Sequence, residues 1–232
     1  MITIRRAQDR YQADHGWLKT SYSFSFADYY DPHNMEFGPM RVLNDDSIDG
    51  HRGFAPHPHR EMEIVTIVLE GKLKHQDSTG QTAITGFGQV QRMSAGTGVV
   101  HSEMNPGAET AKLLQMWFEP QTRGLEPSYE ASDYDLEKLK GALLPVVSKH
   151  PAPGVAAIHQ DMTIYLSRLT KGQPLTFTQP EGRRIYLFVL EGALLLNDGE
   201  KLARRDEARV TETTELALEA AEDSLFMLID LP

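Results

Sequence analysis

Four side chains of the kinds that bind metal ions fall in two short pairs. His57 and His59 are separated by one proline, and His101 and Glu103 are separated by one serine. In an extended segment, residues two apart point to the same face, and the proline between the two histidines disfavours a helix. If the two segments are neighbouring strands, three imidazoles and one carboxylate converge on one point. This donor set suits a borderline divalent metal and is close to the two-His-one-carboxylate set of non-haem iron oxygenases, with one imidazole added.

The residues around the second pair make the pattern more specific. Gly96 and Gly98 predict a tight turn just before His101, and Asn105 follows four residues after it. A lone His-x-His is as readily a pair of surface histidines. Here it is followed by a strand, a turn and then Gly-x-Gly-x-x-His-x-Glu-x-Asn, and this combination predicts a metal site.

The composition narrows the chemistry further. The 232 residues include no cysteine, which excludes disulfides, Cys-based zinc sites, iron–sulfur clusters and thiol nucleophiles. With 23 Lys and Arg against 33 Asp and Glu, the formal net charge is −10, which disfavours binding to nucleic acid or to an anionic membrane. There is no run of ~18–20 apolar residues, no signal-peptide core, and no phosphate loop or dinucleotide fingerprint. We therefore expect a cytoplasmic protein without an organic cofactor.

Short apolar runs punctuated by glycine and proline indicate an all-β chain. Each run has six or seven residues, rich in β-branched and other large apolar types, and the runs are 64–69, 113–118, 185–190 and 225–231. Many short strands with frequent turns are typical of a sandwich or barrel. The best helical signal is 133–142, where Ser132 is the expected N-cap.

The chain contains an internal repeat. Residues 64–77 read IVTIVLEGKLKHQD and residues 185–198 read IYLFVLEGALLLND, with seven of fourteen positions identical at an offset of 121. The alternative interpretation is a chance likeness between two apolar hairpins. An offset of half the chain favours two copies of one β domain, and we predict domains at 1–130 and 155–232 joined by 131–154.

The same offset compares the two copies at the metal site. His57 and His59 correspond to Thr178 and Pro180, and no histidine follows His159. The second copy is therefore expected to be metal-free, with a structural role.

These motifs resemble those of the pirin family within the cupin superfamily. The most specific stretches are GFAPHPHREMEIVTIVLEGKLKHQDSTG at 53–80 and MSAGTGVVHSEMNP at 93–106. Further similarity lies at 15–18, 24–32 and 41–46, and the second half is similar mainly in architecture. The resemblance implies a bicupin, in which two β-sandwich or jelly-roll domains lie face to face, with short helical segments in the connection.

The resemblance also implies a ligand set and an activity. One divalent metal per chain would be held by His57, His59, His101 and Glu103, with Fe(II) favoured and Mn, Ni, Co, Cu and Zn as alternatives. The implied activity is quercetin 2,3-dioxygenase, in which a flavonol and dioxygen react, the central ring opens and carbon monoxide leaves. Glu103 is then ligand and general base. We expect a monomer.

Glu63 is the alternative carboxylate. In cupins generally, a glutamate four residues past the second histidine is a ligand, and Glu63 holds that place with the same strand parity as His57 and His59. The pirin pattern takes its carboxylate at Glu103 instead, which leaves Glu63 beside the site or in the cavity wall.

Other candidates have simpler interpretations. His75 follows a Glu-Gly turn and is expected on the solvent face, with a hydrogen bond to a ligand as the alternative. Trp17 and the Phe24-Ser25-Phe26 stretch are expected to pack in the core, with a stacking platform for an aromatic ligand as the alternative.

A second class of function competes with the enzyme. Some pirins are proposed to act as metal-containing, redox-sensing regulators through protein partners, and the net charge of −10 does not argue against a protein partner. An isomerase on a cupin scaffold is a third possibility, which the pirin-like motifs disfavour. The rate of dioxygen uptake with a flavonol separates the first two.

Overall fold

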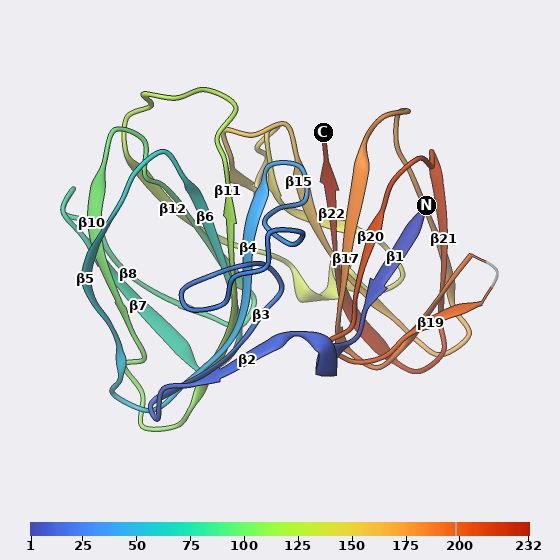
Figure 1. Ribbon diagram of the computed structural model, residues 1–232, viewed down its shortest axis with the longest axis horizontal. Helices are drawn as coiled ribbons and strands as arrows, with labels where there is room; N and C mark the ends of the chain where they lie inside the picture. Colours follow the sequence, from blue (N-terminus) through green and yellow to red (C-terminus); the bar gives the residue numbers. More distant parts are fainter. Residues whose placement is uncertain (198) are drawn as a thin grey trace. The chain divides into compact units, whose positions relative to one another are not determined.

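The computed structural model describes residues 1–197 and 199–232, and nearly all of its regular structure is β-strand (Figure 1). The expected all-β class is confirmed. None of the helices in the described residues is long and apolar enough to cross a membrane. The chain divides into two compact units, each containing a large sheet and a small sheet.

The N-terminal unit consists of Tyr11–Tyr134 together with Lys149–Gln160. In spatial order, its large sheet contains β12 (Ser128–Asp133), β9 (Gln89–Ser94), β6 (Glu63–Glu70), β11 (Ala111–Phe118), β4 (Met40–Ile48), β3 (Leu18–Tyr22) and β2 (Tyr11–Asp14). Its small sheet contains β5 (Gly53–His59), β10 (Val99–Met104), β7 (Lys72–Asp77) and β8 (Thr82–Gly86). The short strand β14 (Ala156–Ala157) lies in the second segment of this unit.

The C-terminal unit consists of Asp135–Ser148 and Asp161–Pro232 together with Met1–Arg10. Its large sheet contains β1 (Ile2–Arg5), β20 (Glu207–Val210), β17 (Arg184–Glu191), β22 (Ser224–Leu231), β15 (Thr163–Leu169) and β13 (Leu144–Ser148). Its small sheet contains β16 (Pro174–Thr178), β21 (Glu215–Ala220), β18 (Leu194–Leu196) and β19 (Glu200–Leu202). The first strand of the chain thus completes the sheet made by the last third. The boundaries at 130 and 154 stay a prediction.

The internal repeat corresponds to equivalent strands of the two units. β6 lies between β9 and β11, and β17 lies between β20 and β22. Each ends at a glutamate that a glycine follows, and these glycines, Gly71 and Gly192, have φ values of 73° and 76°. Because a residue with a Cβ rarely adopts this conformation, the turn after each strand favours glycine. The repeat is therefore structural, and the small sheets correspond strand by strand, with β10 equivalent to β21.

The helical segment is shorter than predicted. β12 continues through Asp133, so Ser132 lies in a strand and is not a cap. A single 3₁₀ turn, η2 (Leu136–Leu139), follows, and Asp135 caps it by accepting a hydrogen bond from the backbone N–H of Glu137. A second such turn, η1 (Ala7–Asp9), follows β1. At the start of the predicted segment, pairing of Ser132 and Asp133 with β9 outweighs the local helix preference, and the residues that remain are too few to form more than one turn.

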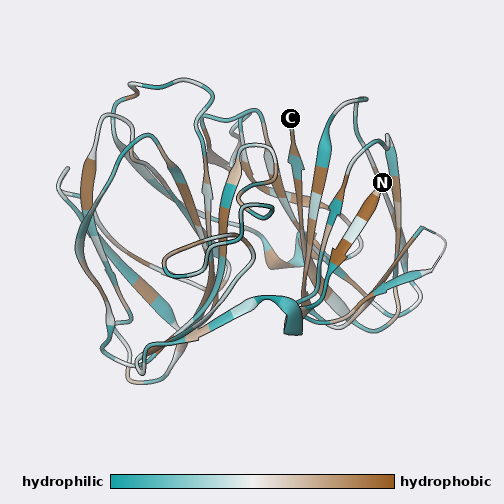
Figure 2. Cartoon of the chain, viewed as in Figure 1, coloured by the Kyte–Doolittle hydropathy of each residue, from teal (hydrophilic) through white to brown (hydrophobic). Residues whose placement is uncertain are grey.

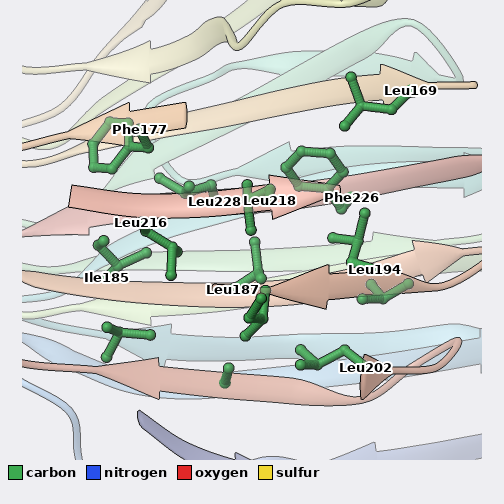
Figure 3. Packing of buried hydrophobic residues seen from close by; sticks show 14 of the residues in the cluster. Leu169, Phe177, Ile185, Leu187, Leu194, Leu202, Leu216, Leu218, Phe226 and Leu228 are labelled. Carbon is green, nitrogen blue, oxygen red and sulfur yellow. The ribbon is translucent and has the colours of Figure 1, made fainter. Parts of the chain in front are cut away.

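The interior of the C-terminal unit is apolar. Strands such as β22 carry strongly apolar stretches, coloured brown in Figure 2. Along β21, alternate residues are buried, and Leu216, Leu218 and Ala220 join one cluster with side chains from β17 and β22 (Figure 3). This strand has the alternation of a sheet with one face in the core.

The N-terminal unit has a polar zone inside its sandwich. On β6, Ile64 and Val68 belong to two separate apolar clusters, and Thr66 lies between them on the same face. Thr66 Oγ1 accepts a hydrogen bond of 3.4 Å from the buried Gln91 side chain, which in turn contacts Glu103. The unit thus gives up part of its apolar core to hydrogen-bonded polar groups.

The alternation on β21 gives a test of the C-terminal core. Leu218→Ala is expected to lower the free energy of unfolding by roughly 2–5 kcal/mol, because it leaves a cavity among fully buried side chains. Its neighbour Glu219 is exposed, so Glu219→Ala is the control and should change stability little. Chemical denaturation measures both. Equal effects of the two changes would contradict the assigned face of β21.

Candidate metal centre

A β-bulge aims the first histidine pair. β5 pairs with β10 so that His57 lies opposite His101 and Phe54 lies opposite Glu103. Two residues of β5, Ala55 and Pro56, therefore face only one residue of β10. An extra residue reverses the side-chain alternation, so Phe54 and His57 line the same cavity although they are three positions apart, an offset that places residues of a regular strand on opposite faces. The bulge is a local feature that positions the site.

The proline between the two histidines suits the place of its strand. β5 is the first strand of the small sheet, and Pro58 pairs with Val100 of β10. Proline has no N–H to donate, and an edge strand tolerates it because one side has no partner strand. His57 and His59 then share a face, as the sequence pattern predicts.

The three imidazoles lie together. Ring centroids of His57 and His101 are 4.5 Å apart, and His59 lies 4.8 Å from each. His57 Nε2 and His101 Nε2 are 3.1 Å apart. Two imidazole nitrogens bonded to one ion at about 2.0–2.1 Å, at near a right angle, are separated by about 3 Å. The geometry of the three side chains therefore fits a single divalent ion.

Glu103 is buried and doubly hydrogen-bonded. Its Oε1 accepts from Gln91 Nε2 and its Oε2 from Gln115 Nε2, both at 2.7 Å. It forms a second group of potential ligands with His101 and His75, so His101 belongs to both groups. A carboxylate has about four lone-pair directions, so two amide donors leave room for a metal or a proton. The structure places Glu103 beside His101, and its role as a ligand stays a prediction.

Burial keeps the imidazoles of His59 and His101 neutral. Burial, with the neighbouring His57 ring, lowers the pKa of His59 to about 4. Burial and the other imidazoles lower the pKa of His101 to about 3. A neutral imidazole with a free lone pair is the form that binds metal. Burial also raises the pKa of the Glu103 carboxyl, against the opposing hydrogen bonds from Gln115 and Gln91.

Glu63 does not join this cluster. Its carboxylate accepts from Ser94 Oγ at 2.5 Å and contacts His159 Nδ1 at 3.3 Å. The shared parity with the histidines is lost because β5 ends at His59, Glu61 adopts a positive φ of 52°, and β6 starts in the other sheet. Glu63 instead holds the segment Lys149–Gln160 of this unit.

The expectation that His75 faces solvent is wrong. The side chain is fully buried, its Nε2 lies 2.8 Å from Asp77 Oδ2, and Tyr129 stacks on its ring with centroids 4.3 Å apart. Burial raises the pKa of Asp77, and hydrogen bonds from His75, Thr79 and Gln81 outweigh it and lower the pKa below its usual range. The pattern His-x-Asp on a strand is the signal that could have indicated this pair.

A cavity of about 400 Å³ opens beside the imidazoles. It reaches His57 and Glu103, and its aromatic lining consists of Trp17, Tyr22, Phe26, Phe54 and Trp117. Trp17 and Phe26, for which core packing was predicted, are both half-buried and line the cavity, and Trp17 also packs against the apolar cluster that contains Leu18 and Val68. Phe24 is buried as predicted.

Two glutamines of the site were missed from sequence. Gln115 donates to Glu103 and accepts from Trp117 Nε1 at 3.1 Å, while Gln91 accepts from Tyr129 Oη at 3.1 Å. A single glutamine within the buried run Leu113–Phe118 was the available signal, because an unpaired amide there would be costly. Trp117 also packs its ring against His59 at 4.7 Å.

The fold and the site define a two-unit β protein of the cupin type with an imidazole-rich centre in one unit. The Pirin family model matches residues 4–118, and the model for the quercetinase C-terminal cupin domain matches residues 145–231. The chain belongs to the pirin family.

Relatives extend over the whole chain. The Escherichia coli K12 protein named quercetin 2,3-dioxygenase is 40% identical over 100% of this chain and 99% of its own length. The crystal structure of YhhW from Escherichia coli covers 100% of this chain and 98% of its own, with 39% identity and a TM-score of 0.95. A nickel(II) complex of bacterial pirin YhhW is 38% identical, covers 100% and 99% of the two chains, and has a TM-score of 0.94.

The lowered pKa values make the stability of the metal-free chain depend on pH. The unfolded chain takes up protons on His59 near pH ~6.5, whereas the folded chain resists until about pH 4. The contribution of His59 to the free energy of unfolding is therefore present above pH ~6.5 and is lost as pH falls toward 4. Asp46 and Glu103, whose pKa values burial raises, act in the opposite sense.

The measurement is therefore a difference between variants. Urea denaturation at several pH values should show wild type losing stability relative to His59→Gln between pH ~6.5 and 4. The exposed His33 supplies the control, and His33→Gln should follow wild type. If the free energies of unfolding of wild type and His59→Gln changed in parallel with pH, the lowered pKa of His59 would be contradicted.

Proposed function

We propose that this chain is a metal-dependent quercetin 2,3-dioxygenase, which opens the central ring of a flavonol with dioxygen and releases carbon monoxide. The observation that carries the proposal is the cluster of the His57, His59 and His101 imidazoles next to an aromatic-lined cavity, whose wall includes His57 and Glu103. The full-length identity of 40% to a protein with that name supports it.

We propose His57, His59, His101 and Glu103 as the ligands of one divalent ion, with Fe(II) as the metal. The nickel(II) complex of YhhW supports a divalent metal in this family. When bound, the ion supplies Lewis-acid stabilisation of the flavonol anion. The expectations of a monomeric and cytoplasmic chain stay predictions.

The cavity walls provide binding and water exclusion. A flavonol is a flat aromatic molecule, and the rings of Trp17, Phe26 and Trp117 offer apolar faces and edges to it. A cavity of about 400 Å³ lies in the usual range for small-molecule sites, about 300–1,000 Å³. Aromatic contacts at the wall hold the substrate ring, while His57 and Glu103 meet its polar edge.

Glu103 takes up the proton of the flavonol 3-hydroxyl. Its side chain lines the cavity together with Gln115, which donates to its Oε2. Burial raises the pKa of this carboxyl, which makes it a stronger base than an exposed glutamate. Gln91 and Gln115 hold the carboxylate in place, so the proton is received without reorientation. The flavonol anion then combines with dioxygen, and the ring opens with loss of carbon monoxide.

The ligand set predicts one divalent ion per chain. Metal analysis of anaerobically purified protein should give a stoichiometry near one, and His101→Ala should remove most of the metal because it deletes a nitrogen shared by both groups. The exposed His33 again supplies the control, so His33→Ala should keep the full content. A stoichiometry near two without excess metal would contradict the single site.

Glu103→Gln separates metal binding from proton transfer. Glutamine keeps the size and one oxygen donor, so much of the metal should remain. It cannot accept the flavonol proton, so turnover per bound metal should fall by roughly 10²–10⁴-fold. Dioxygen uptake, carbon monoxide release and metal content are measured on the same sample with quercetin.

Two outcomes would change this view. An unchanged rate per metal in Glu103→Gln would remove the base role and leave Glu103 at most a ligand. A negligible rate per metal in wild type across several flavonols would favour the alternative, a redox-sensing regulator that acts through a protein partner.

A further inference from the structure

A relay of hydrogen-bond contacts runs across the small sheet, from His101 on β10 through His75 to Asp77 on β7. His101 Nδ1 lies 3.4 Å from His75 Nδ1, and His75 Nε2 lies 2.8 Å from Asp77 Oδ2. The relay follows from strand pairing, since β10 and β7 are neighbours with Glu103 opposite His75 and His101 opposite Asp77. The side chains of His75 and Asp77 are 0% and 2% exposed, so the protein, not solvent, decides where their protons lie.

The carboxylate of Asp77, at the end of this relay, decides which nitrogen donates and which accepts in each of its hydrogen bonds. A carboxylate can only accept, so His75 must carry its proton on Nε2 to bond Asp77. Its Nδ1 then has a lone pair and accepts, so the proton between the two rings belongs to His101 Nδ1. The Nε2 of His101, on the opposite side of the ring, is left with a free lone pair.

The same logic acts on the facing histidine. His57 Nδ1 lies 2.8 Å from the carbonyl oxygen of Ala55, which also can only accept. His57 therefore carries its proton on Nδ1 and has a bare Nε2. Two bare nitrogens then face each other at 3.1 Å, which is unfavourable unless a cation lies between them.

We propose that Asp77 and His75 are positioning residues that hold His101 in the Nδ1-protonated tautomer, so that its Nε2 is ready to bind the metal. The inference rests on the metal site of the proposed function and goes beyond its ligand set. Without this relay, His101 can carry its proton on Nε2 and donate it to His57 Nε2. That arrangement satisfies both rings but closes the site to metal.

The surroundings keep the relay rigid. Asp77 Oδ1 accepts from Thr79 N at 2.9 Å, from Thr79 Oγ1 at 2.6 Å and from Gln81 N at 3.2 Å. Its two oxygens therefore have separate tasks, one holding the β7–β8 turn and the other holding His75. Tyr129 stacks on the His75 ring from β12 and prevents it from turning.

This division of tasks makes Asp77→Asn a sharp test. The backbone N–H groups of Thr79 and Gln81 need an acceptor, so the amide oxygen of the new side chain takes the Oδ1 place. Its NH₂ group then faces His75 Nε2 and donates to it. His75 must move its proton to Nδ1, and His101 must move its own to Nε2. The variant thus reverses the relay while it keeps the turn.

Long-range ¹H–¹⁵N NMR on the metal-free protein at pH 8 reads the tautomers directly. Wild type should show His101 protonated at Nδ1 and His75 at Nε2, and Asp77→Asn should show both reversed. A wild-type His101 protonated at Nε2 would overturn the proposal, and this measurement needs no variant to fold.

Affinity for Ni²⁺, measured by competition with a chelator, provides the second readout. Asp77→Asn is expected to weaken binding by roughly 10–100-fold, the usual effect of losing a group that orients a metal ligand. Asp77→Ala removes the same charge without reversing the relay and should weaken Ni²⁺ binding less, although it loses the turn bonds. Asp133→Asn, at an exposed carboxylate, is the matched control and should bind like wild type.

The outcomes keep this inference separate from the proposed function. Equal Ni²⁺ affinities of Asp77→Asn and Asp77→Ala would reduce Asp77 to a source of charge and overturn the relay. Neither readout uses a flavonol, so reversed tautomers and weakened Ni²⁺ binding would support the relay even in a protein that does not turn over quercetin. Conversely, if the protein turns over quercetin and Asp77→Asn does not change the His101 tautomer, the proposed enzyme function would stand and the relay would be overturned.

Discussion

The pairing of β5 with β10 is the constraint on which the site depends. It sets His57 opposite His101 and, through the bulge at Ala55 and Pro56, turns both Phe54 and His57 toward the cavity. A shift of pairing by one residue would reverse the faces of one strand, because side chains alternate along it. The glycines support this register. At Gly53, an added Cβ would lie 2.1 Å from the backbone oxygen of Glu103, so the two strands meet where only a hydrogen fits.

Groups that can act only as acceptors or only as donors organise the site. The Ala55 carbonyl and the Asp77 carboxylate accept, and they lie at the two ends of a row of imidazoles. The amides of Gln91 and Gln115 donate to Glu103. The carbonyl of Ala55 and the carboxylate of Asp77 thus favour one tautomer of the imidazoles that they contact, while the two amides hold the Glu103 carboxylate in place. In the N-terminal unit, a hydrogen-bonded network thus takes the place of part of the apolar core.

The two halves of the chain show alternative uses of one sandwich. β10 and β21 hold equivalent places, yet the inward residues are His101 and Glu103 on one and Leu216 and Leu218 on the other. In the second unit the apolar side chains pack against each other and need no polar partners. A polar interior requires partners from several strands, and in the first unit these come from β7, β9 and β11 of both sheets.

The all-β class, the repeat and the two pairs of potential ligands could be read from the sequence, because strand alternation and the i, i+2 spacing are local properties. That the two pairs meet depends on the pairing of β5 with β10. The tertiary structure alone excluded Glu63, because the chain bends at Glu61 and enters the other sheet. It also buried His75 and brought Trp17 and Phe26 to the cavity. Those outcomes depend on which strands become neighbours. Pairing between distant segments is set by the packing of the whole sandwich, which the local pattern around a single residue does not encode.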